Sequence, residues 1–285
     1  MNKNIKISTD SISDLSPELL QEYNIPVMPL FINMDGESLP DDVTMPDKIY
    51  EFVTRTKKLP KTSTRSVDAY KEFYAQHKPS NGALIHFTIS DKLSASYSLA
   101  IQAAEQMENV FVIDSKSLST GAGLNVLYAC DLAAKDELSA AEIADKCIER
   151  TKAVQASFFL DSLEFLHKGG RCSGLARFFA SILKIKPMIK VVDGKMVAGK
   201  KYRGKFDALV DKYVDDTLAE FNTPCLDRVF VTYTTAPEGM VQRVKDKLAA
   251  AHPFKEILVT KAGGTITSHC GKNTIGILYF NDGNK

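Results

Sequence analysis

The chain has 285 residues, a formal net charge of +1 at pH 7, 44% hydrophobic residues and 25% charged residues. This composition is typical of a soluble globular protein with one large domain or two of ordinary size, and it excludes fibrous and intrinsically disordered proteins. The N-terminus lacks the apolar core of a signal peptide, and no apolar run approaches the ~20 residues of a membrane-spanning helix, so we expect a cytoplasmic protein.

The first half of the chain repeats the order strand, loop and helix. A short apolar strand at 5–7 runs into a polar loop, after which Ser16 and Pro17 mark the start of a helix. The next expected elements are strands within 25–32, a turn at Asp35-Gly36, helices at 46–56 and 67–77, strands at 82–88 and 109–113, and helices that end near 106, run over 120–135 and follow Ser139. The continuous apolar strands predict an open, mainly parallel sheet with flanking helices. Ligands of such sheets bind at the carboxyl ends of the strands, where Ser, Thr and Asp are abundant here.

The pattern changes after about residue 155. A strand at 156–160 precedes the sequence Gly169-Gly170-Arg171, and Asp193-Gly194 between two apolar runs is typical of a tight hairpin turn. Helices are then expected at 205–221, 237–251 and 265–269, and strands at 228–234, 254–260 and 274–280. A hairpin followed by crossovers predicts a mixed sheet of the α/β or α+β class. We therefore predict two domains, residues 1–155 and residues 156–285, with a ligand held between them.

The sequence Gly169-Gly170-Arg171 is the strongest candidate for a ligand contact. Glycine lets the backbone approach a ligand closely, and the planar guanidinium group of arginine suits a carboxylate or a phosphate. Ser173 is a suitable N-cap for a following helix, whose strongly apolar face would be formed by Phe178, Phe179, Ile182 and Leu183. A cation and an apolar surface are therefore expected side by side. These residues alone do not identify the anion that Arg171 binds.

The sequence motifs of nucleotide, metal and disulfide sites are incomplete or absent. The sequence Gly121-Ala122-Gly123 lacks the third glycine of a dinucleotide loop, where Val126 stands, and Gly271-Lys272 lacks the hydroxyl residue of a P-loop. The five histidines have no metal-ligand spacing, so no metal site is expected. The five cysteines contain no C-x-x-C pair and are expected to be free thiols.

Two of the histidines differ in their surroundings. His86 lies inside an apolar strand and is expected to be a core residue, whereas His269 follows glycines and hydroxyl residues and can face a ligand. A serine-dependent esterase or phosphate-transfer enzyme would use Ser94 and His269 with Asp10 or Asp14, although the G-x-S-x-G motif is absent. This enzyme remains the alternative to a binding protein.

Residues 184–205 carry eight basic side chains and one acidic side chain, whereas the rest of the chain is acidic. A solvated surface accounts for such a segment. So does a docking face for an acidic partner protein or an anionic membrane surface, with Lys200, Lys201 and Arg203 as candidate contacts. Nucleic acid is not expected, because no motif combines basic and aromatic residues as nucleic-acid-binding modules do.

Several weak motifs follow one another along almost the whole chain. They are Asp10-Ser11 with Asp14-Leu15, Thr62-Ser63, the loop from Ser90 to Ser94, Asp114-Ser115 with Ser119 to Gly123, Lys168 to Arg171, Lys186-Pro187 before the Asp193-Gly194 turn, and His269-x-Gly271. Because these motifs occur in this order, the chain resembles the DegV family of fatty-acid-binding proteins. This family includes the acyl-carrying subunit of bacterial fatty acid kinase. The chain departs from the family pattern at Thr64-Arg65, Ala95-Ser96 and Lys272-Asn273.

The resemblance implies that Thr62, Ser94, Arg171 and His269 hold the carboxylate of a long-chain fatty acid. It also implies a carrier without a catalytic residue, cofactor or nucleotide site, which presents the acid to a separate ATP-dependent kinase for conversion into an acyl phosphate. Physical reasoning agrees, because a carboxylate in an apolar cleft needs hydrogen-bond donors around it. The residues expected to contact the tail, which also suit an ordinary core face, are Phe178, Phe179, Ile182, Leu183 and Ile185.

Overall fold

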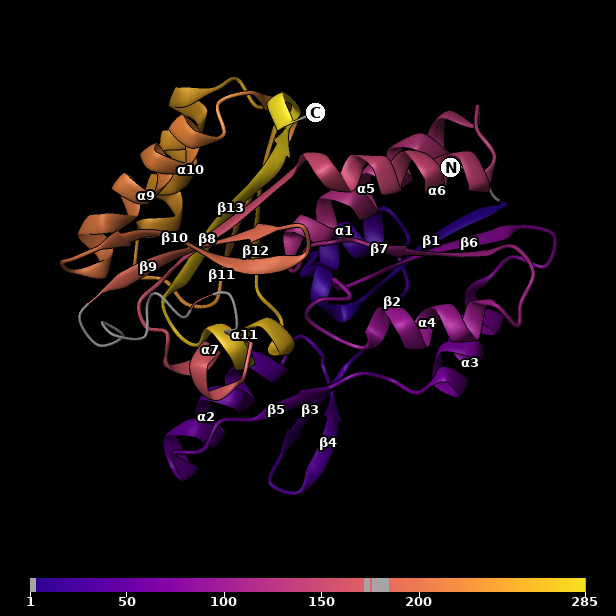
Figure 1. Ribbon diagram of the computed structural model, residues 1–285, viewed down its shortest axis with the longest axis horizontal. Helices are drawn as coiled ribbons and strands as arrows, with labels where there is room; N and C mark the ends of the chain where they lie inside the picture. Colours follow the sequence, from indigo (N-terminus) through magenta and orange to yellow (C-terminus); the bar gives the residue numbers. More distant parts are fainter. Residues whose placement is uncertain (1–3, 172–174, 176–184, 285) are drawn as a thin grey trace.

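The computed structural model describes residues 4–171, 175 and 185–284, which form three sheets with helices packed on and between them (Figure 1). The strands are β1 (Ile5–Asp10), β2 (Val27–Met28), β3 (Phe31–Met34), β4 (Glu37–Pro40), β5 (Lys61–Ser63), β6 (Ala83–Thr88), β7 (Val110–Asp114), β8 (Val154–Leu160), β9 (Lys186–Val192), β10 (Lys195–Tyr202), β11 (Pro224–Tyr233), β12 (Glu256–Lys261) and β13 (Thr274–Asn281). The α-helices are α1 (Pro17–Glu22), α2 (Met45–Thr56), α3 (Val67–His77), α4 (Ser96–Ala104), α5 (Thr120–Lys135), α6 (Ala140–Arg150), α7 (Glu164–Lys168), α9 (Phe206–Glu220), α10 (Met240–Ala251) and α11 (Gly264–Cys270). No helix within these described ranges has the length and apolar character needed to cross a membrane.

The first sheet is parallel throughout and has the strand order β2-β1-β6-β7. Its central strand β6 is buried along its whole length, as a continuous apolar run predicts. The helices α3 and α4 cover one face of this sheet, where Tyr70, Tyr74 and Leu84 pack together, and α5 and α6 cover the other face. The prediction of an open parallel sheet with flanking helices is confirmed.

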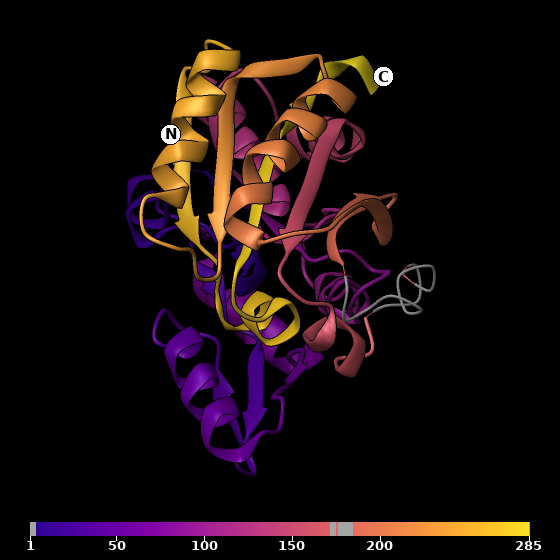
Figure 2. The same cartoon turned by 90° about the vertical axis from the view of Figure 1, so that its left-hand side faces the viewer.

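The second sheet is mixed and has the strand order β10-β9-β8-β13-β11-β12. The strands β11 and β12 pair in parallel, and the other neighbours pair antiparallel. The helices α9 and α10 cover one face (Figure 2), where Phe159 stacks on Phe206 and Tyr213. Asp193 and Gly194, with φ of 48° and 78°, close the predicted hairpin between β9 and β10.

The helix α5 lies between the two larger sheets and contacts strands of both. Gly121 allows this close packing, because a Cβ atom there would lie 3.2 Å from Ala156 Cβ on β8 and 2.2 Å from Ser117 Oγ in the preceding loop. The Gly-Ala-Gly sequence therefore serves helix packing. One apolar cluster includes buried side chains of α5 and of strands on both sides of it. The two halves share this core, and the division at residue 155 stays a prediction.

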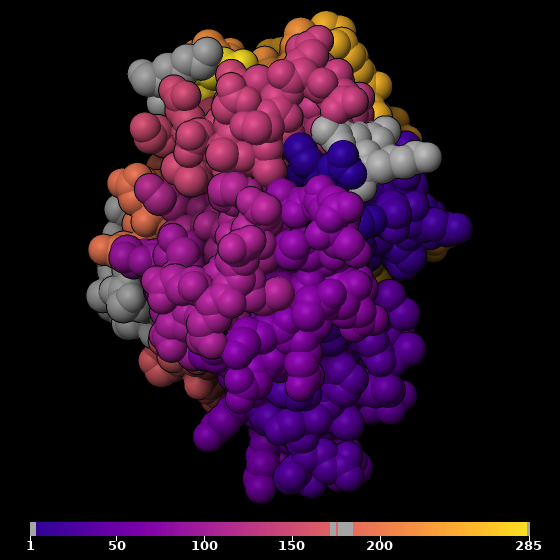
Figure 3. All heavy atoms as spheres, turned by 90° about the vertical axis from the view of Figure 1, so that its right-hand side faces the viewer, coloured from indigo at the N-terminus to yellow at the C-terminus, as the bar shows by residue number. Residues whose placement is uncertain are grey.

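A small antiparallel sheet of order β4-β3-β5 lies below the other two sheets in Figure 1, with α2 packed on it. The predicted turn at Asp35-Gly36 joins β3 to β4. Figure 3 shows that the N-terminal half of the chain forms a continuous face from α5 and α6 down to this small sheet. The strand β5 is not expected from the sequence, because its three residues have no apolar alternation.

Three further features differ from the expected elements. The strand β1 continues through polar residues to Asp10, because the neighbouring strand β6 satisfies them: Thr9 Oγ1 donates to Phe87 O at 3.2 Å. The short helix α7 stands where no helix is predicted. The helix expected after Ser173, with its apolar face, lies outside the described residues.

Candidate functional site

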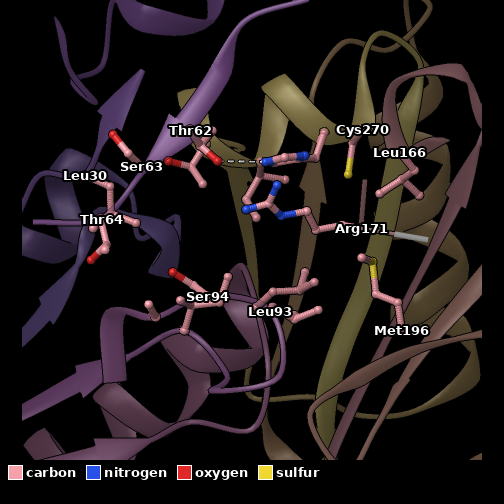
Figure 4. A pocket seen from close by; sticks show the side chains of 16 residues that line it. Leu30, Thr62, Ser63, Thr64, Leu93, Ser94, Leu166, Arg171, Met196 and Cys270 are labelled. Carbon is pink, nitrogen blue, oxygen red and sulfur yellow. Dashed lines mark hydrogen bonds between the residues drawn. The ribbon is translucent and has the colours of Figure 1, made fainter. Parts of the chain in front are cut away.

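A cavity of about 280 Å³ lies where segments of all three sheets meet (Figure 4). Four residues that the sequence predicts as carboxylate ligands line it, namely Thr62, Ser94, Arg171 and His269. Most of the remaining wall is apolar and includes Leu30, Ile89, Leu93, Leu118, Leu166 and Met196. Figure 4 shows the labelled side chains of Thr62, Ser94 and Arg171 directed into the same space. The cavity thus combines a polar corner with apolar walls.

Four separate segments form this polar corner. Thr62 is the middle residue of β5 and pairs with Ile32 of β3. Ser94 lies in the loop between β6 and α4, at the carboxyl end of a parallel strand, where ligands of open α/β sheets bind. Arg171 follows α7, and His269 lies in the last turn of α11. The fold, rather than any local pattern, places these four side chains together.

His269 is neutral at physiological pH. Burial, followed by the positive charge of Arg171, lowers the pKa of His269 to about 4. Its Nε2 atom lies 2.9 Å from Thr62 Oγ1, and its buried Nδ1 atom has no hydrogen-bond partner among the described residues. An unpaired N–H is costlier than an unpaired acceptor, so we assign the proton to Nε2. Nε2 then donates to Thr62, and the Thr62 hydroxyl proton is left to donate into the cavity.

The double glycine shapes the backbone beside this histidine. A Cβ atom at Gly169 would lie 2.6 Å from His269 Nδ1, so only glycine lets the imidazole ring approach the chain here. Gly170 has a φ of 71°, a left-handed conformation that favours glycine. The exposed Arg171 donates from Nη1 to Gly169 O at 2.9 Å. Within the described part of the wall Arg171 is the one cation and no carboxylate is present, so the cavity suits an anion.

The N-terminus of α11 is fixed by Asp41. Its two carboxylate oxygens accept hydrogen bonds from Gly264 N at 2.7 Å, from Thr265 N at 2.9 Å and from Thr265 Oγ1 at 2.6 Å. This carboxylate satisfies backbone N–H groups that a helix leaves unpaired. No sequence pattern indicates such a role, because two aspartates after Pro40 are typical of an exposed turn.

Asp14 holds the residue just before the same helix. Its Oδ1 atom accepts a hydrogen bond from Gly263 N at 2.8 Å, and its Oδ2 atom accepts one from Ser119 Oγ. The side chain is buried, and this burial raises the pKa of Asp14 to about 7 against the opposing effect of the Ser119 hydrogen bond. Asp14 therefore links the start of α11 to the start of α5.

The hydrogen bonds around Ser94 and His269 differ from those of a catalytic triad. Ser94 Oγ lies 3.0 Å from Ser96 Oγ, whereas Nε2 of His269 is bonded to a threonine. The two candidate acids, Asp10 and Asp14, are bonded to other groups. Since a triad needs a base joined to both nucleophile and acid, this geometry does not favour the enzyme alternative.

Comparison with known proteins identifies the family. The model of the family described as "Uncharacterised protein, DegV family" matches residues 4–282. The chain belongs to the DegV family. A curated DegV relative, the fatty acid-binding protein of Thermotoga maritima, is 28% identical over 283 residues, which cover 95% of this chain and 96% of that protein.

Solved structures of other proteins share the DegV fold of this chain. A DegV family protein from Thermus thermophilus, described for its fatty acid binding, has a TM-score of 0.89 and 26% identity over 98% of this chain and 99% of its own. A stearic acid-binding protein from Eubacterium ventriosum has a TM-score of 0.82 and 26% identity over 97% of this chain and 98% of its own. Fatty acid binding is thus described for each of these three similar proteins.

A second cavity, of about 20 Å³, adjoins the first in this DegV protein. The two share Leu118, Ile266 and Cys270, and the smaller one continues between α11 and the strands β11 and β13. Ile185, predicted to contact a tail, is buried in the core before β9 and lines neither cavity. The other predicted tail contacts lie outside the described residues: Phe178, Phe179, Ile182 and Leu183.

Acidic side chains of the same chain partly neutralise the basic segment. Lys190 pairs with Glu220 at 2.5 Å, and Lys200 pairs with Asp216 at 2.8 Å. Lys200 and Lys201 lie on β10, and the exposed Arg203 follows it. Part of the positive charge that the sequence offers for docking is therefore used within the fold.

Proposed function

We propose that this protein binds a long-chain fatty acid, with the carboxylate against Thr62, Ser94, Arg171 and His269 and the tail in the apolar part of the cavity. The observation that carries this proposal is the make-up of the cavity wall, where one cation and several neutral donors face apolar side chains. A carboxylate in an apolar cavity requires such donors. The fatty acid binding of the DegV relatives supports the same class of ligand.

In this arrangement the head group sets the orientation and the tail supplies most of the affinity. Each buried methylene is worth ~0.8 kcal/mol, so a tail of ~14 methylenes contributes roughly 11 kcal/mol before ordering costs. The hydroxyls of Thr62 and Ser94 donate to the carboxylate, and Arg171 balances its charge at the open end. Neutral His269 holds the Thr62 oxygen and adds no second positive charge.

We further infer that the protein is a carrier, which presents the bound carboxylate to a separate ATP-dependent kinase for acyl-phosphate formation. The exposure of Arg171 at the cavity supports this role, because it keeps the carboxylate end within reach of another protein. Lys200, Lys201 and Arg203 are the proposed contacts with the kinase or with an anionic membrane surface.

Native mass spectrometry of the purified protein, followed by lipid extraction, tests the binding proposal. We expect a co-purified fatty acid, or uptake of added acid in preference to the alcohol of equal chain length. Arg171→Ala should weaken binding of the acid about tenfold and leave the alcohol unaffected, because a charge-assisted hydrogen bond is lost. Lys168→Ala is the matched control, since Lys168 is an exposed cation paired with Glu164 that does not line the cavity. Recovery of no acid, together with no uptake of added acid, would end the proposal.

Phosphorylation of the bound acid by the partner kinase tests the carrier role. At saturating lipid, Arg171→Ala should still reduce the rate of acyl-phosphate formation. An unchanged rate would contradict the assignment of Arg171 as a ligand of the carboxylate. Charge reversal at Lys200, Lys201 and Arg203 should slow phosphorylation and leave lipid binding unchanged. If lipid binding falls to the same extent, the segment is structural instead.

A further inference from the structure

A further cavity, of about 200 Å³, lies beside the polar corner of the fatty-acid cavity, and we call it the outer pocket. Leu93, Arg171 and Met196 line both cavities, so the two adjoin at Arg171 (Figure 4). The rest of the described wall consists of Lys92, Lys195 and the glycine that precedes Arg171. Three cations and no carboxylate therefore line the described part of the outer pocket, and such a wall suits an anion.

Three separate segments supply these cations. Lys92 lies in the loop between β6 and α4, Lys195 is the first residue of β10, and Arg171 follows α7. The fully buried Ser90 joins the first two segments, because its hydroxyl donates to Gly194 O at 2.9 Å and accepts a hydrogen bond from Lys92 N at 3.2 Å. Only glycine permits this contact, since a Cβ atom at Gly194 would lie 2.3 Å from Ser90 Oγ. The backbones of Lys92 and Lys195 are thus held at the same pocket.

The three cations are available to a ligand. Neither Lys195 nor Arg171 forms an ion pair within the described ranges. Lys92 Nζ bonds to Asp91 Oδ2 at 2.6 Å, but both side chains are partly exposed, with 47% and 35% of their areas open to solvent. Exposed ion pairs of this kind contribute little free energy, so Lys92 can turn from Asp91 to a more highly charged anion.

The number of cations indicates the charge of the ligand. One guanidinium group balances a carboxylate, whereas two further lysines suit an anion with a second negative charge. A phosphate group carries a charge of roughly −2 at neutral pH and has three strong acceptor oxygens. When a fatty acid becomes an acyl phosphate, the carboxyl group loses its charge and the phosphate beyond it carries the charge instead. Arg171 lines both cavities, so it can face the anion before and after this change.

We infer that the outer pocket is a phosphate-binding site, in which Lys92, Lys195 and Arg171 hold the phosphate group of an acyl phosphate while the tail occupies the fatty-acid cavity. The inference rests on the proposed function, because the tail and the carbonyl group use the site proposed for the acid. A carrier with this pocket binds the phosphorylated lipid more tightly than the free acid. It therefore retains the product of the kinase.

Equilibrium titration with lipids of one chain length tests the site. The probes are hexadecanoic acid and hexadecyl phosphate, a stable substitute for an acyl phosphate, at about pH 8, where the phosphate is a dianion. Lys195→Ala and Lys92→Ala should each weaken binding of hexadecyl phosphate about tenfold and leave binding of the acid within twofold, because each removes a charge-assisted contact to the phosphate. Lys168→Ala is the matched control, since this exposed lysine precedes Arg171 closely in the chain but lines neither cavity.

Asp91→Asn provides a test of opposite sign. It releases Lys92 from its ion pair and removes a negative charge beside the pocket, so it should strengthen binding of hexadecyl phosphate about threefold. Inorganic phosphate, added to the protein loaded with hexadecanoic acid, distinguishes a free phosphate from one carried by the lipid. We expect it to bind far more weakly than hexadecyl phosphate, because it has no tail to bury.

Several outcomes overturn this inference. It fails if the two lysine variants keep the wild-type affinity for hexadecyl phosphate, if they weaken the phosphate and the acid equally, or if Asp91→Asn brings no gain. Inorganic phosphate that binds as tightly as hexadecyl phosphate would also overturn it, since the pocket would then serve a free anion. A wild-type protein that binds hexadecanoic acid no better than hexadecanol would instead contradict the proposed function itself. The two failures are therefore distinguishable.

Discussion

The two ends of the short helix α11 differ in how their polar groups are satisfied. At the N-terminal end, the backbone N–H groups of three successive residues donate to the buried carboxylates of Asp14 and Asp41. At the C-terminal end, His269 faces the cavity and keeps one ring nitrogen without a partner among the described residues. The protein saturates one end with its own side chains, whereas at the other end His269 donates to Thr62 and leaves the Thr62 hydroxyl proton available to a ligand. A rigid attachment at one end can thus hold a ligand contact in place at the other.

Loss of the Asp41 carboxylate should have the largest effect. Asp41→Ala leaves three buried donors without an acceptor, namely Gly264 N, Thr265 N and Thr265 Oγ1. Each such donor costs about 1–3 kcal/mol, so we expect a loss of at least about 3 kcal/mol in the free energy of unfolding. Urea denaturation measures this quantity. Asp42→Ala is the control, because Asp42 is exposed and bonds to Thr44, and it should cost less than about 1 kcal/mol. Equal losses in the two variants would show that α11 does not depend on Asp41.

Asp14, which holds the N-terminal end of α11, makes the free energy of unfolding depend on pH. Its pKa is raised from 3.8 to about 7, so the folded protein binds a proton that the unfolded chain releases, and this contribution to stability is lost as pH rises from about 4 to about 7. In Asp14→Asn the amide oxygen still accepts from Gly263 N, and the pH-dependent term is absent. Relative to wild type, the variant should gain up to roughly 4 kcal/mol between pH 4 and pH 8.

Denaturation of both proteins across this pH range checks the prediction. The lowered pKa of His269 gives a slope of opposite sign, with stability rising from about pH 4 to pH 6.5, but it is common to both proteins and cancels in the difference. Parallel stability profiles for wild type and Asp14→Asn would contradict the assignment of the titration to Asp14.

Most of the regular structure follows from the sequence. The helices α3 and α5 begin and end where they are predicted, and His86 is a core residue as expected, bonded to Ser8 at 2.9 Å on the neighbouring strand. Continuous apolar strands, caps and the Asp193-Gly194 turn are local signals, and local signals suffice for such elements.

The parts that could not be predicted depend on partners far away in the chain. The bonds of Asp41 to α11 join residues 223 or more positions apart, and the Ser90 hydroxyl donates to Gly194 O, 104 positions away. The three-residue strand that carries Thr62 has no pattern of its own and exists because β3 pairs with it. The resemblance to the DegV family, rather than any spacing, indicated that Thr62 and His269 belong to one site. Asp41 carries no comparable signal in a single sequence.

The C-terminal end of α11, which carries His269, can be disturbed while the bonds of Asp14 and Asp41 to its N-terminal end stay intact. In Gly169→Ala the new Cβ atom would lie 2.6 Å from His269 Nδ1 and 2.9 Å from Phe165 O, so the imidazole ring must move and lose its bond to Thr62. We expect about tenfold weaker binding of a fatty acid, equivalent to about 1.4 kcal/mol, in equilibrium titrations. The clash with Phe165 O and the lost bond to Thr62 should also lower the free energy of unfolding by about 1–3 kcal/mol, although the bonds of Asp14 and Asp41 to α11 are untouched.

The neighbouring glycine provides a matched control for this substitution. A Cβ atom at Gly170 meets no atom within 4 Å, but the residue has a φ of 71°, so Gly170→Ala should lower the free energy of unfolding by about 1 kcal/mol through backbone strain and leave binding nearly unchanged. The two variants thus separate contact with His269 from backbone conformation. Equal loss of affinity in both would mean that the double glycine shapes the loop before Arg171, and that the close approach to His269 is incidental to binding.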